Sequence, residues 1–142
     1  MWKRLVGSKV YEASLADDFN NTLRAYGFGA DAPSPFAKFY ENAENCRCIV
    51  VVNLDEENAR TMTVDSDTTI LNSYTIANGG RRLSSIDVMI NGIEMAQTVE
   101  EGGEDLSVDL DTLLGVENGG NGQGDEVQLP PLTVTFVVVE NK

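Results

Sequence analysis

The stretch Ser85–Val99, SIDVMINGIEMAQTV, decides the fold, because it sets strand direction, register and buried face from local chemistry. Asn91-Gly92 is the preferred pair for a two-residue type I′ turn, since both central residues of that turn need positive φ. The turn predicts an antiparallel hairpin whose opposed pairs are Ile90/Ile93, Met89/Glu94, Val88/Met95 and Ile86/Gln97. One face of this hairpin is apolar. A hairpin this short is not stable alone, so its apolar face needs further strands from the rest of the chain.

Several other segments have the composition of strands. Cys48–Leu54 is apolar on both faces apart from Asn53, which is typical of a strand in the middle of a packed sheet. The strongest strand is LTVTFVVVE, Leu132–Glu140, which should also be buried on both sides. Shorter strands are predicted at 61–64, 68–76 and 106–110. We therefore expect a mainly β protein, an antiparallel β-sandwich of about seven or eight strands, with jelly-roll or immunoglobulin-like topology.

Two short helices are expected ahead of the main strands. Ser14 and Asp17 resemble a capping box, and Leu15, Phe19, Leu23 and Tyr26 form a stripe with helical spacing, which predicts a helix near 15–26. Ser34-Pro35 has the pattern of an N-cap followed by a first helical residue, which predicts a second helix near 35–44. The expected organisation is an N-terminal arm at 1–13 and a single β-sandwich domain at 14–142.

Charge and hydropathy bear on two classes of partner, nucleic acids and membranes. The chain has 142 residues, with 23 acidic and 10 basic side chains and a formal net charge of −13. Such a protein is not expected to bind nucleic acid through general electrostatics. The first residues are not followed by an apolar run, and the chain contains no stretch of about 20 apolar residues. We therefore expect no membrane partner, and synthesis in the cytoplasm without a signal peptide.

The sequence has few residues suited to catalysis or metal binding. It contains no histidine, which excludes the Ser-His-Asp and Cys-His designs and histidine-ligated metals. Cys46 and Cys48 are expected to be reduced thiols on one face of a buried strand. No catalytic residue, cofactor or metal ligand is predicted. Calcium at acidic pairs such as Asp65-x-Asp67 or Asp109-x-Asp111 is a weaker alternative, because no EF-hand spacing is present.

Basic and acidic residues are unevenly distributed along the chain. Residues 83–141 contain no Lys or Arg, whereas residues 1–12 contain Lys3, Arg4 and Lys9 against one acidic residue. This separation fits an arm that lies on a neighbouring copy, with apolar side chains in a groove and basic side chains on carboxylates. An arm folded back on its own domain fits equally well. The candidate partner-binding residues are Trp2, Lys3, Arg4, Leu5, Val6 and Lys9.

These observations favour a non-enzymatic structural protein that works by assembly. Its partners would be copies of itself or a larger protein shell or fibre, as in a viral capsid accessory protein that is incorporated into a virion. The alternative is a monomeric binding module for calcium, carbohydrate or a protein, using the acidic loops at 100–105 and 117–126. An enzyme that relies on carboxylates alone ranks third, because general acid–base catalysis needs a pocket that the sequence does not reveal.

Overall fold

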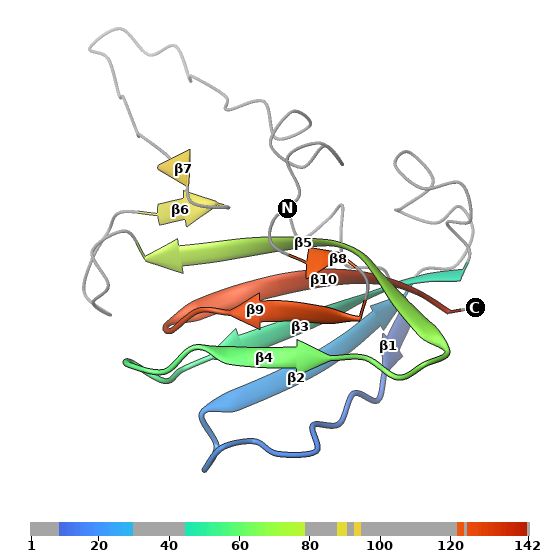
Figure 1. Cartoon of the computed structure of the whole chain (residues 1–142), viewed down its shortest axis with the longest axis horizontal. Helices are drawn as coiled ribbons and strands as arrows, with labels where there is room; N and C mark the ends of the chain where they lie inside the picture. The colour runs from blue at the N-terminus through green and yellow to red at the C-terminus, as the bar shows by residue number, and fades with distance from the viewer. Residues whose placement is uncertain are drawn as a thin grey trace, which may run out of the picture.

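The computed structural model describes residues 9–29, 45–78, 88–90, 93–94, 122–123 and 125–141, and these are almost entirely strand and connecting loop (Figure 1). Among them, no helical segment has the length and hydropathy needed to cross a membrane. The strands in the described part of the chain are β1 (Lys9–Tyr11), β2 (Leu23–Gly29), β3 (Cys46–Asn53), β4 (Arg60–Thr63), β5 (Thr68–Asn78), β6 (Val88–Ile90), β7 (Ile93–Glu94), β8 (Gly122–Gln123), β9 (Glu126–Leu129) and β10 (Thr133–Asn141).

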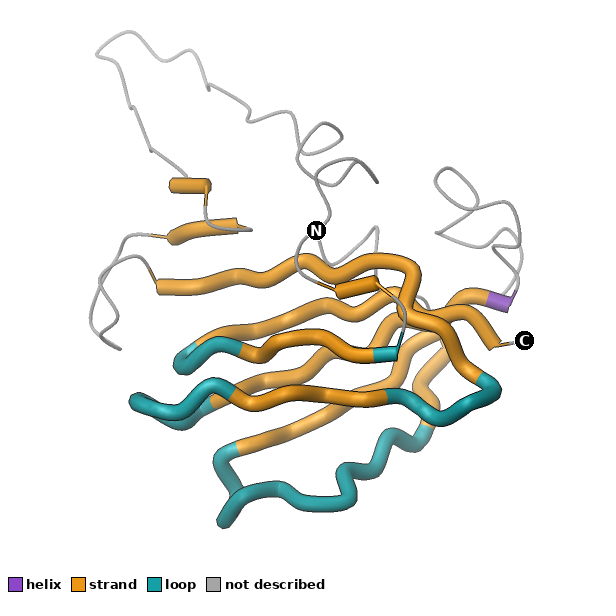
Figure 2. The backbone as a smooth tube through the Cα atoms, viewed as in Figure 1, coloured by secondary structure: helices purple, strands orange, loops and turns teal. Residues whose placement is uncertain are grey.

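The strands form two antiparallel sheets. In the described residues the larger sheet has seven strands in the order β1-β2-β3-β10-β5-β6-β7, and the smaller has three in the order β4-β9-β8. Every strand pair is antiparallel. Figure 2 shows the strands of both sheets in orange and the turns that connect them in teal. The expected mainly β, antiparallel class is confirmed.

β10 is the central strand of the larger sheet. It pairs with β3 on one side, where Val138 lies opposite Cys48, and with β5 on the other, where Phe136 lies opposite Tyr74. Its residues 135–139 are all buried, with exposed fractions of 0–3 %. A strand whose successive residues are all buried must be covered on both faces of its sheet. The sequence expectation that this strand is buried on both sides is therefore confirmed.

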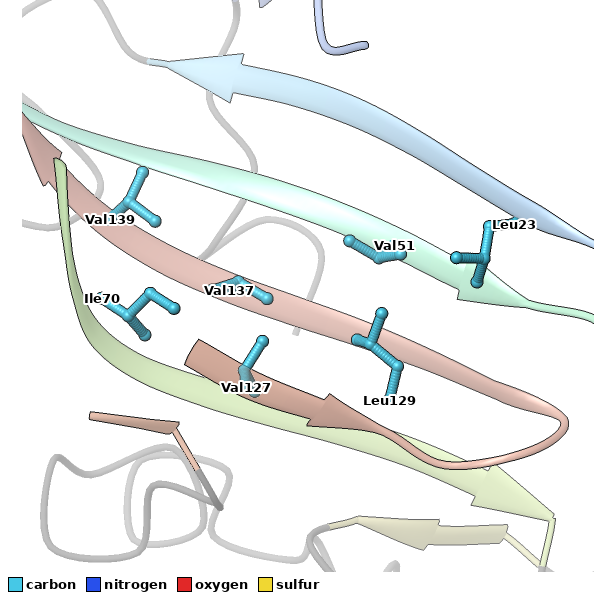
Figure 3. Packing of buried hydrophobic residues seen from close by; sticks show 7 residues of the cluster. All are labelled: Leu23, Val51, Ile70, Val127, Leu129, Val137 and Val139. Carbon is cyan, nitrogen blue, oxygen red and sulfur yellow. The ribbon is translucent and has the colours of Figure 1, made fainter. Parts of the chain in front are cut away.

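The two faces of the larger sheet carry separate apolar clusters. One cluster consists of Cys46, Cys48, Val50, Tyr74, Phe136 and Val138. On the opposite face, Val127 and Leu129 from β9 pack against Val137 from β10, so the smaller sheet contributes to this second cluster. Figure 3 shows the second cluster, whose buried members are Leu23, Val51, Ile70, Val127, Leu129, Val137 and Val139. Contact between the sheets is therefore apolar and confined to one face of the larger sheet.

The predicted helix near 15–26 is wrong. Residues 12–22 are loop, shown in teal in Figure 2, and Leu23 begins β2. Asp17 Oδ1 accepts a hydrogen bond of 2.8 Å from the N–H of Phe19, and this local turn competes with helix formation. Phe19, Asn20 and Asn21 then have φ of 48°, 59° and 67°, and three left-handed residues in succession end any right-handed helix.

Other sequence expectations have mixed outcomes. The central hairpin has the predicted register, because Ile90 pairs with Ile93 and Met89 with Glu94. Strands expected at 48–54, 61–64, 68–76 and 132–140 correspond to β3, β4, β5 and β10. Two short strands, β8 and β9, were not predicted, because the glycine-rich stretch before Pro130 reads as loop. The helix near 35–44 and the strand at 106–110 lie outside the described residues.

Candidate functional site

The edge of the larger sheet at β1 is the first candidate for a functional surface. β1 pairs with β2 through Lys9 opposite Gly29, Val10 opposite Phe28 and Tyr11 opposite Gly27, and it is the last strand at this end of the described sheet. Its three residues are exposed. Val10 is 75 % exposed, which is the highest value among the large exposed apolar side chains of the described residues. An exposed strand edge of this kind is a template for pairing with another chain.

An exposed apolar patch lies beside this edge. Residues opposed in an antiparallel pair project to the same face, so Val10 and Phe28 share one face, and Tyr26, two residues before Phe28, lies on it as well. Tyr26 is 50 % exposed and Phe28 is half-buried. We call Val10, Tyr26 and Phe28 the edge patch. Clustered exposed apolar side chains mark interaction surfaces more often than single ones do.

A cleft lies on the opposite face of the same end of the sheet. Its volume is about 520 Å³, and it is lined by β1 to β4, by the start of β5 and the end of β10, and by the loop segment 12–16. The apolar part of its lining consists mainly of Leu15, Ala25, Ile49, Met62, Val64 and Val139. Glu12 and Asp65 also line the cleft, and both are exposed. The cleft therefore combines apolar and polar lining in similar measure, including two solvent-accessible carboxylates.

Two glycines of β2 make room for Tyr11, which lines the cleft. A Cβ at Gly29 would clash with Cε2 of Tyr11 and lie 2.9 Å from Cδ of Arg47. A Cβ at Gly27 would lie 3.1 Å from the carbonyl oxygen of Tyr11. The missing side chains let Tyr11 lie flat against β2, and the Arg47 guanidinium carbon then sits 4.8 Å from the centre of the Tyr11 ring. Sequence reasoning missed this arrangement, although Gly27 and Gly29 at a spacing of two are a signal of close approach to a strand face.

The interactions that hold Arg47 include a contact with an aromatic ring and a hydrogen bond to the backbone. One is its position over the Tyr11 ring. The other is a hydrogen bond of 2.8 Å, which its Nη1 donates to the carbonyl oxygen of Cys46. The guanidinium group of Arg47 thus lies against the Tyr11 ring and the backbone of β3. The carboxylates of Glu12 and Asp65 are the charges of opposite sign around the same cleft.

The two thiols are buried in the larger sheet, and the acidic pair Asp65 and Asp67 lies in a turn. Cys46 and Cys48 are free and buried on one face of β3, as predicted. Burial raises the pKa of Cys48 to about 12, so its thiol is protonated and a poor nucleophile at neutral pH. Asp65 and Asp67 lie in the turn between β4 and β5, closed by a hydrogen bond of 2.9 Å from the N–H of Thr68 to the carbonyl oxygen of Asp65, rather than on a strand face. In the described ranges, no three His, Cys, Asp or Glu residues lie close enough to hold a metal ion.

Most of the predicted arm cannot be placed. Trp2, Lys3, Arg4, Leu5 and Val6 lie outside the described residues, and so do Asp109, Asp111 and the loop at 100–105. Of the predicted partner-binding residues, Lys9 is described, and it is the first residue of β1. The arm therefore leads directly into the edge strand of the larger sheet.

Comparison with known proteins gives little further information. No protein-family model and no curated protein matches the sequence. Similar solved structures include CelM2, a bifunctional glucanase-xylanase protein from a metagenome library, at 9 % identity and a TM-score of 0.44 over 96 % of this chain and 19 % of that one. An arabinofuranosidase has 14 % identity and a TM-score of 0.37, and the thermostable GH51 α-L-arabinofuranosidase from Thermotoga petrophila RKU-1 has 13 % and 0.35, each over 84 % of this chain and 19 % of that one. The chain thus spans about a fifth of these proteins, and likeness at this level carries no argument about function.

Proposed function

We propose that this protein is a non-enzymatic structural subunit that works by assembly with copies of itself, within a larger shell or fibre such as the decoration of a viral capsid. The observation that supports this proposal best is the β1 edge, where Val10 is 75 % exposed and Tyr26 is 50 % exposed. The predicted partner-binding residues 2–6 lead directly into this edge. The β1 edge and the arm would therefore form one continuous surface for binding the partner.

The fold that we propose for the subunit is a β-sandwich of jelly-roll or immunoglobulin-like type. Support comes from Val127 and Leu129 of the smaller sheet, which pack on Val137 of the larger one. A subunit of this kind has an exposed edge at each end of an open sheet, and edges are the usual route by which β proteins associate.

The test is the native mass by light scattering over a concentration series. We expect the mass of the full-length protein to rise with concentration, and the Val10→Lys variant to remain a monomer, because a charge at the centre of the edge patch opposes its burial. Leu54→Lys is the matched control, since Leu54 is 52 % exposed but lies outside the edge patch. A full-length protein that stays monomeric at every concentration, and for which no larger shell or fibre partner is recovered, would contradict the proposal.

A monomeric binding module is the second candidate, and the cleft favours it. Its volume of about 520 Å³ is within the range of small-molecule sites. Under this reading, calcium or a soluble oligosaccharide should raise the melting temperature, and the Met62→Trp variant, which fills the cleft, should abolish the increase. The absence of any such increase would remove this candidate.

A further inference from the structure

β4 is an edge strand of the smaller sheet. It pairs with β9 on one side and is the first in the order β4-β9-β8 of the described strands. The N–H of Val64, just after β4, donates a hydrogen bond of 3.1 Å to the carbonyl oxygen of Asp125. This bond continues the register of the pair, in which Thr63 lies opposite Glu126. Val64 and Asp125 are therefore opposed residues that bond to each other directly.

The same bond identifies the backbone groups of β4 that point away from β9. In an antiparallel ladder, directly bonded residues alternate with residues whose N–H and C=O groups point to the other side. Met62 therefore bonds to β9 as Val64 does to Asp125, whereas Thr61 and Thr63 direct their backbone groups outward. In the part of the chain that the structure describes, no hydrogen bond joins these groups to another segment. The outer edge of β4 is thus open to an added strand.

The open edge of β4 borders the cleft. Met62, Thr63 and Val64 belong to its lining, and so do residues 12–16, which follow the edge strand of the larger sheet. Residues 12–15 have no strand partner, and the half-buried Ala13 and Leu15 alternate with exposed neighbours, which is the pattern of an extended segment (Figure 2). The cleft is therefore bordered by two separate extended segments, and one of them has unpaired outward backbone groups.

The floor of the cleft is one face of the larger sheet, and strand register gives its length. At one end the lining includes Asn141 and Thr68, which are paired with each other. At the other end it includes Ala25, whose partner Val51 lies opposite Thr135. The strand from Thr135 to Asn141 covers about 20 Å, which matches a strand of about six residues.

We propose that the cleft is an acceptor site for an extended segment of a different protein, which adds to the β4 edge as a further strand and carries apolar side chains flanked by basic ones. This inference rests on the proposed function, because a protein of the larger shell or fibre would supply the segment. Hydrogen bonds to the backbone of Thr61 and Thr63 would hold the strand. Every second side chain would lie on the floor, against Ala25, Ile49 and Val139.

The charges at the cleft determine the chemistry of that segment. Glu12 and Asp65 are exposed carboxylates in the lining, whereas the guanidinium carbon of Arg47 lies 4.8 Å from the centre of the Tyr11 ring. The chain has a formal net charge of −13, so its overall field also favours a cationic partner. Basic side chains beside the apolar ones would therefore pair with Glu12 and Asp65.

The open edge can be tested by amide hydrogen exchange, followed by NMR on the full-length, isotope-labelled protein. We expect the N–H groups of Thr61 and Thr63 to exchange much faster than those of Met62 and Val64, which bond to β9 and to Asp125. Equal protection along the strand would mean that the outer edge of β4 is already paired, and it would overturn the inference.

The added strand can be tested by titrating the full-length protein with the synthetic peptide KVTVTVTK, blocked at both ends. We expect the N–H signals of residues 61–65 and 12–16 to shift, and exchange at Thr63 to slow at saturation. Thr63→Pro should weaken the affinity by about tenfold or more, because proline has no N–H to donate and its ring obstructs the incoming strand. The fold should survive, since the lost N–H points away from β9, and the melting temperature checks this.

Thr63→Ala separates the backbone from the side chain at the same position. It keeps the N–H and changes an exposed side chain, so its affinity for the peptide should stay within about twofold of the native value. An equal loss of affinity in Thr63→Ala and Thr63→Pro would mean that the peptide contacts the side chain, and strand addition would be wrong.

The charge of the segment can be tested with the peptide EVTVTVTE. It should bind about tenfold or more weakly than KVTVTVTK at low ionic strength, because its carboxylates face those of Glu12 and Asp65. The double variant Glu12→Gln/Asp65→Asn should lose most of this preference. Equal affinities of the native protein for the two peptides would contradict a basic segment.

The outcomes separate this inference from the proposed function. If the native mass rises with concentration but KVTVTVTK causes no shift up to millimolar concentrations, assembly stands and the acceptor site is wrong. If the peptide binds with the expected variant pattern while the protein stays a monomer, the acceptor site stands and self-association through the β1 edge is wrong. If a soluble oligosaccharide shifts the cleft signals and the peptide does not, the cleft is a carbohydrate site and the inference fails.

Discussion

At the scale of single residues, Asn53 connects the end of β3 to the smaller sheet. It is 1 % exposed, and its Nδ2 lies 3.0 Å from the carbonyl oxygens of Leu129 and Pro130 and 3.1 Å from that of Asn58. Its Oδ1 accepts a hydrogen bond of 3.0 Å from the N–H of Asp55. This buried amide therefore supplies hydrogen-bond partners to backbone groups from several chain segments, at the point where those segments meet.

The first prediction concerns this amide. Asn53→Ala should lower the free energy of unfolding by about 2–3 kcal/mol, because it leaves buried carbonyl oxygens without a donor. Asn53→Asp should be less stable still at neutral pH, since a carboxylate would face those carbonyl oxygens. Urea denaturation at pH 7 measures both. If Asn53→Asp were as stable as the native protein, the amide would not be the donor.

The second prediction concerns the pH dependence of stability at Asp55. The N–H groups of Glu57 and Asn58, and then the side chains of Asn58 and Arg60, lower its pKa to about 2 from the ordinary 3.8. A lowered pKa in the folded state means that the ionised carboxylate stabilises the fold above pH 4, and that this contribution is lost as pH falls from about 4 to about 2. Asp55→Asn should therefore show a shallower loss of stability over this range in thermal melts. Glu56→Gln, at an exposed carboxylate one residue away, should keep the native slope.

At the scale of elements, the attachment of β1 depends on a glycine in β2. Tyr11 lies across Gly29, and Arg47 lies over the Tyr11 ring. The element is short, with three residues paired to one neighbour in the described sheet, so the packing of Tyr11 contributes much of what holds it. A single methyl group added at Gly29 should therefore weaken the packing of β1 on β2.

The third prediction follows from this packing. Gly29→Ala should destabilise the protein by about 1–3 kcal/mol, because its Cβ clashes with the Tyr11 ring and crowds Cδ of Arg47. Combining it with Tyr11→Ala should give a smaller loss than the sum of the two single variants, since the clash is then removed. Denaturant midpoints of the three variants complete the cycle. Strict additivity would mean that Tyr11 does not lie across Gly29.

At the scale of the whole molecule, the two sheets are joined through a small apolar contact. Leu129 is 1 % exposed and belongs to a cluster that contains side chains from β2, β3, β5 and β10 (Figure 3). Val127 and Leu129 of the smaller sheet therefore both pack in the shared core of the larger one. Loss of this contact should weaken the fold as a unit rather than one strand.

The fourth prediction tests that contact. Leu129→Ala should cost about 2–5 kcal/mol in the free energy of unfolding, because it removes buried methyl groups and leaves a cavity between the sheets. Leu54→Ala, at a side chain that is 52 % exposed, should change it by no more than about 0.5 kcal/mol. Equal effects at the two positions in urea denaturation would show that the smaller sheet does not pack on the larger one.

The sequence by itself determined the elements whose signals are local. The apolar runs of β3 and β10 predict buried strands, and Asn91-Gly92 predicts the register of β6 and β7, because turn chemistry and two-residue periodicity act over a few neighbouring residues. The same reasoning failed at 15–26, where apolar residues have helical spacing. Asp17 and the left-handed residues Phe19–Asn21 make residues 15–22 a loop, and Leu23 begins the strand β2.

Only the tertiary structure decided which distant segments meet. β10 lies between β3 and β5, and the cleft gathers residues from Tyr11 to Asn141, although nothing in their local sequence specifies these neighbours. Contacts such as Tyr11 on Gly29, or Asn53 on Leu129, depend on the strand pairing and packing of the whole sheet. Local chemistry selects strands and turns, whereas the burial of apolar faces across the whole chain selects their order, and this order places the edge patch and the cleft on opposite faces beside the same strand.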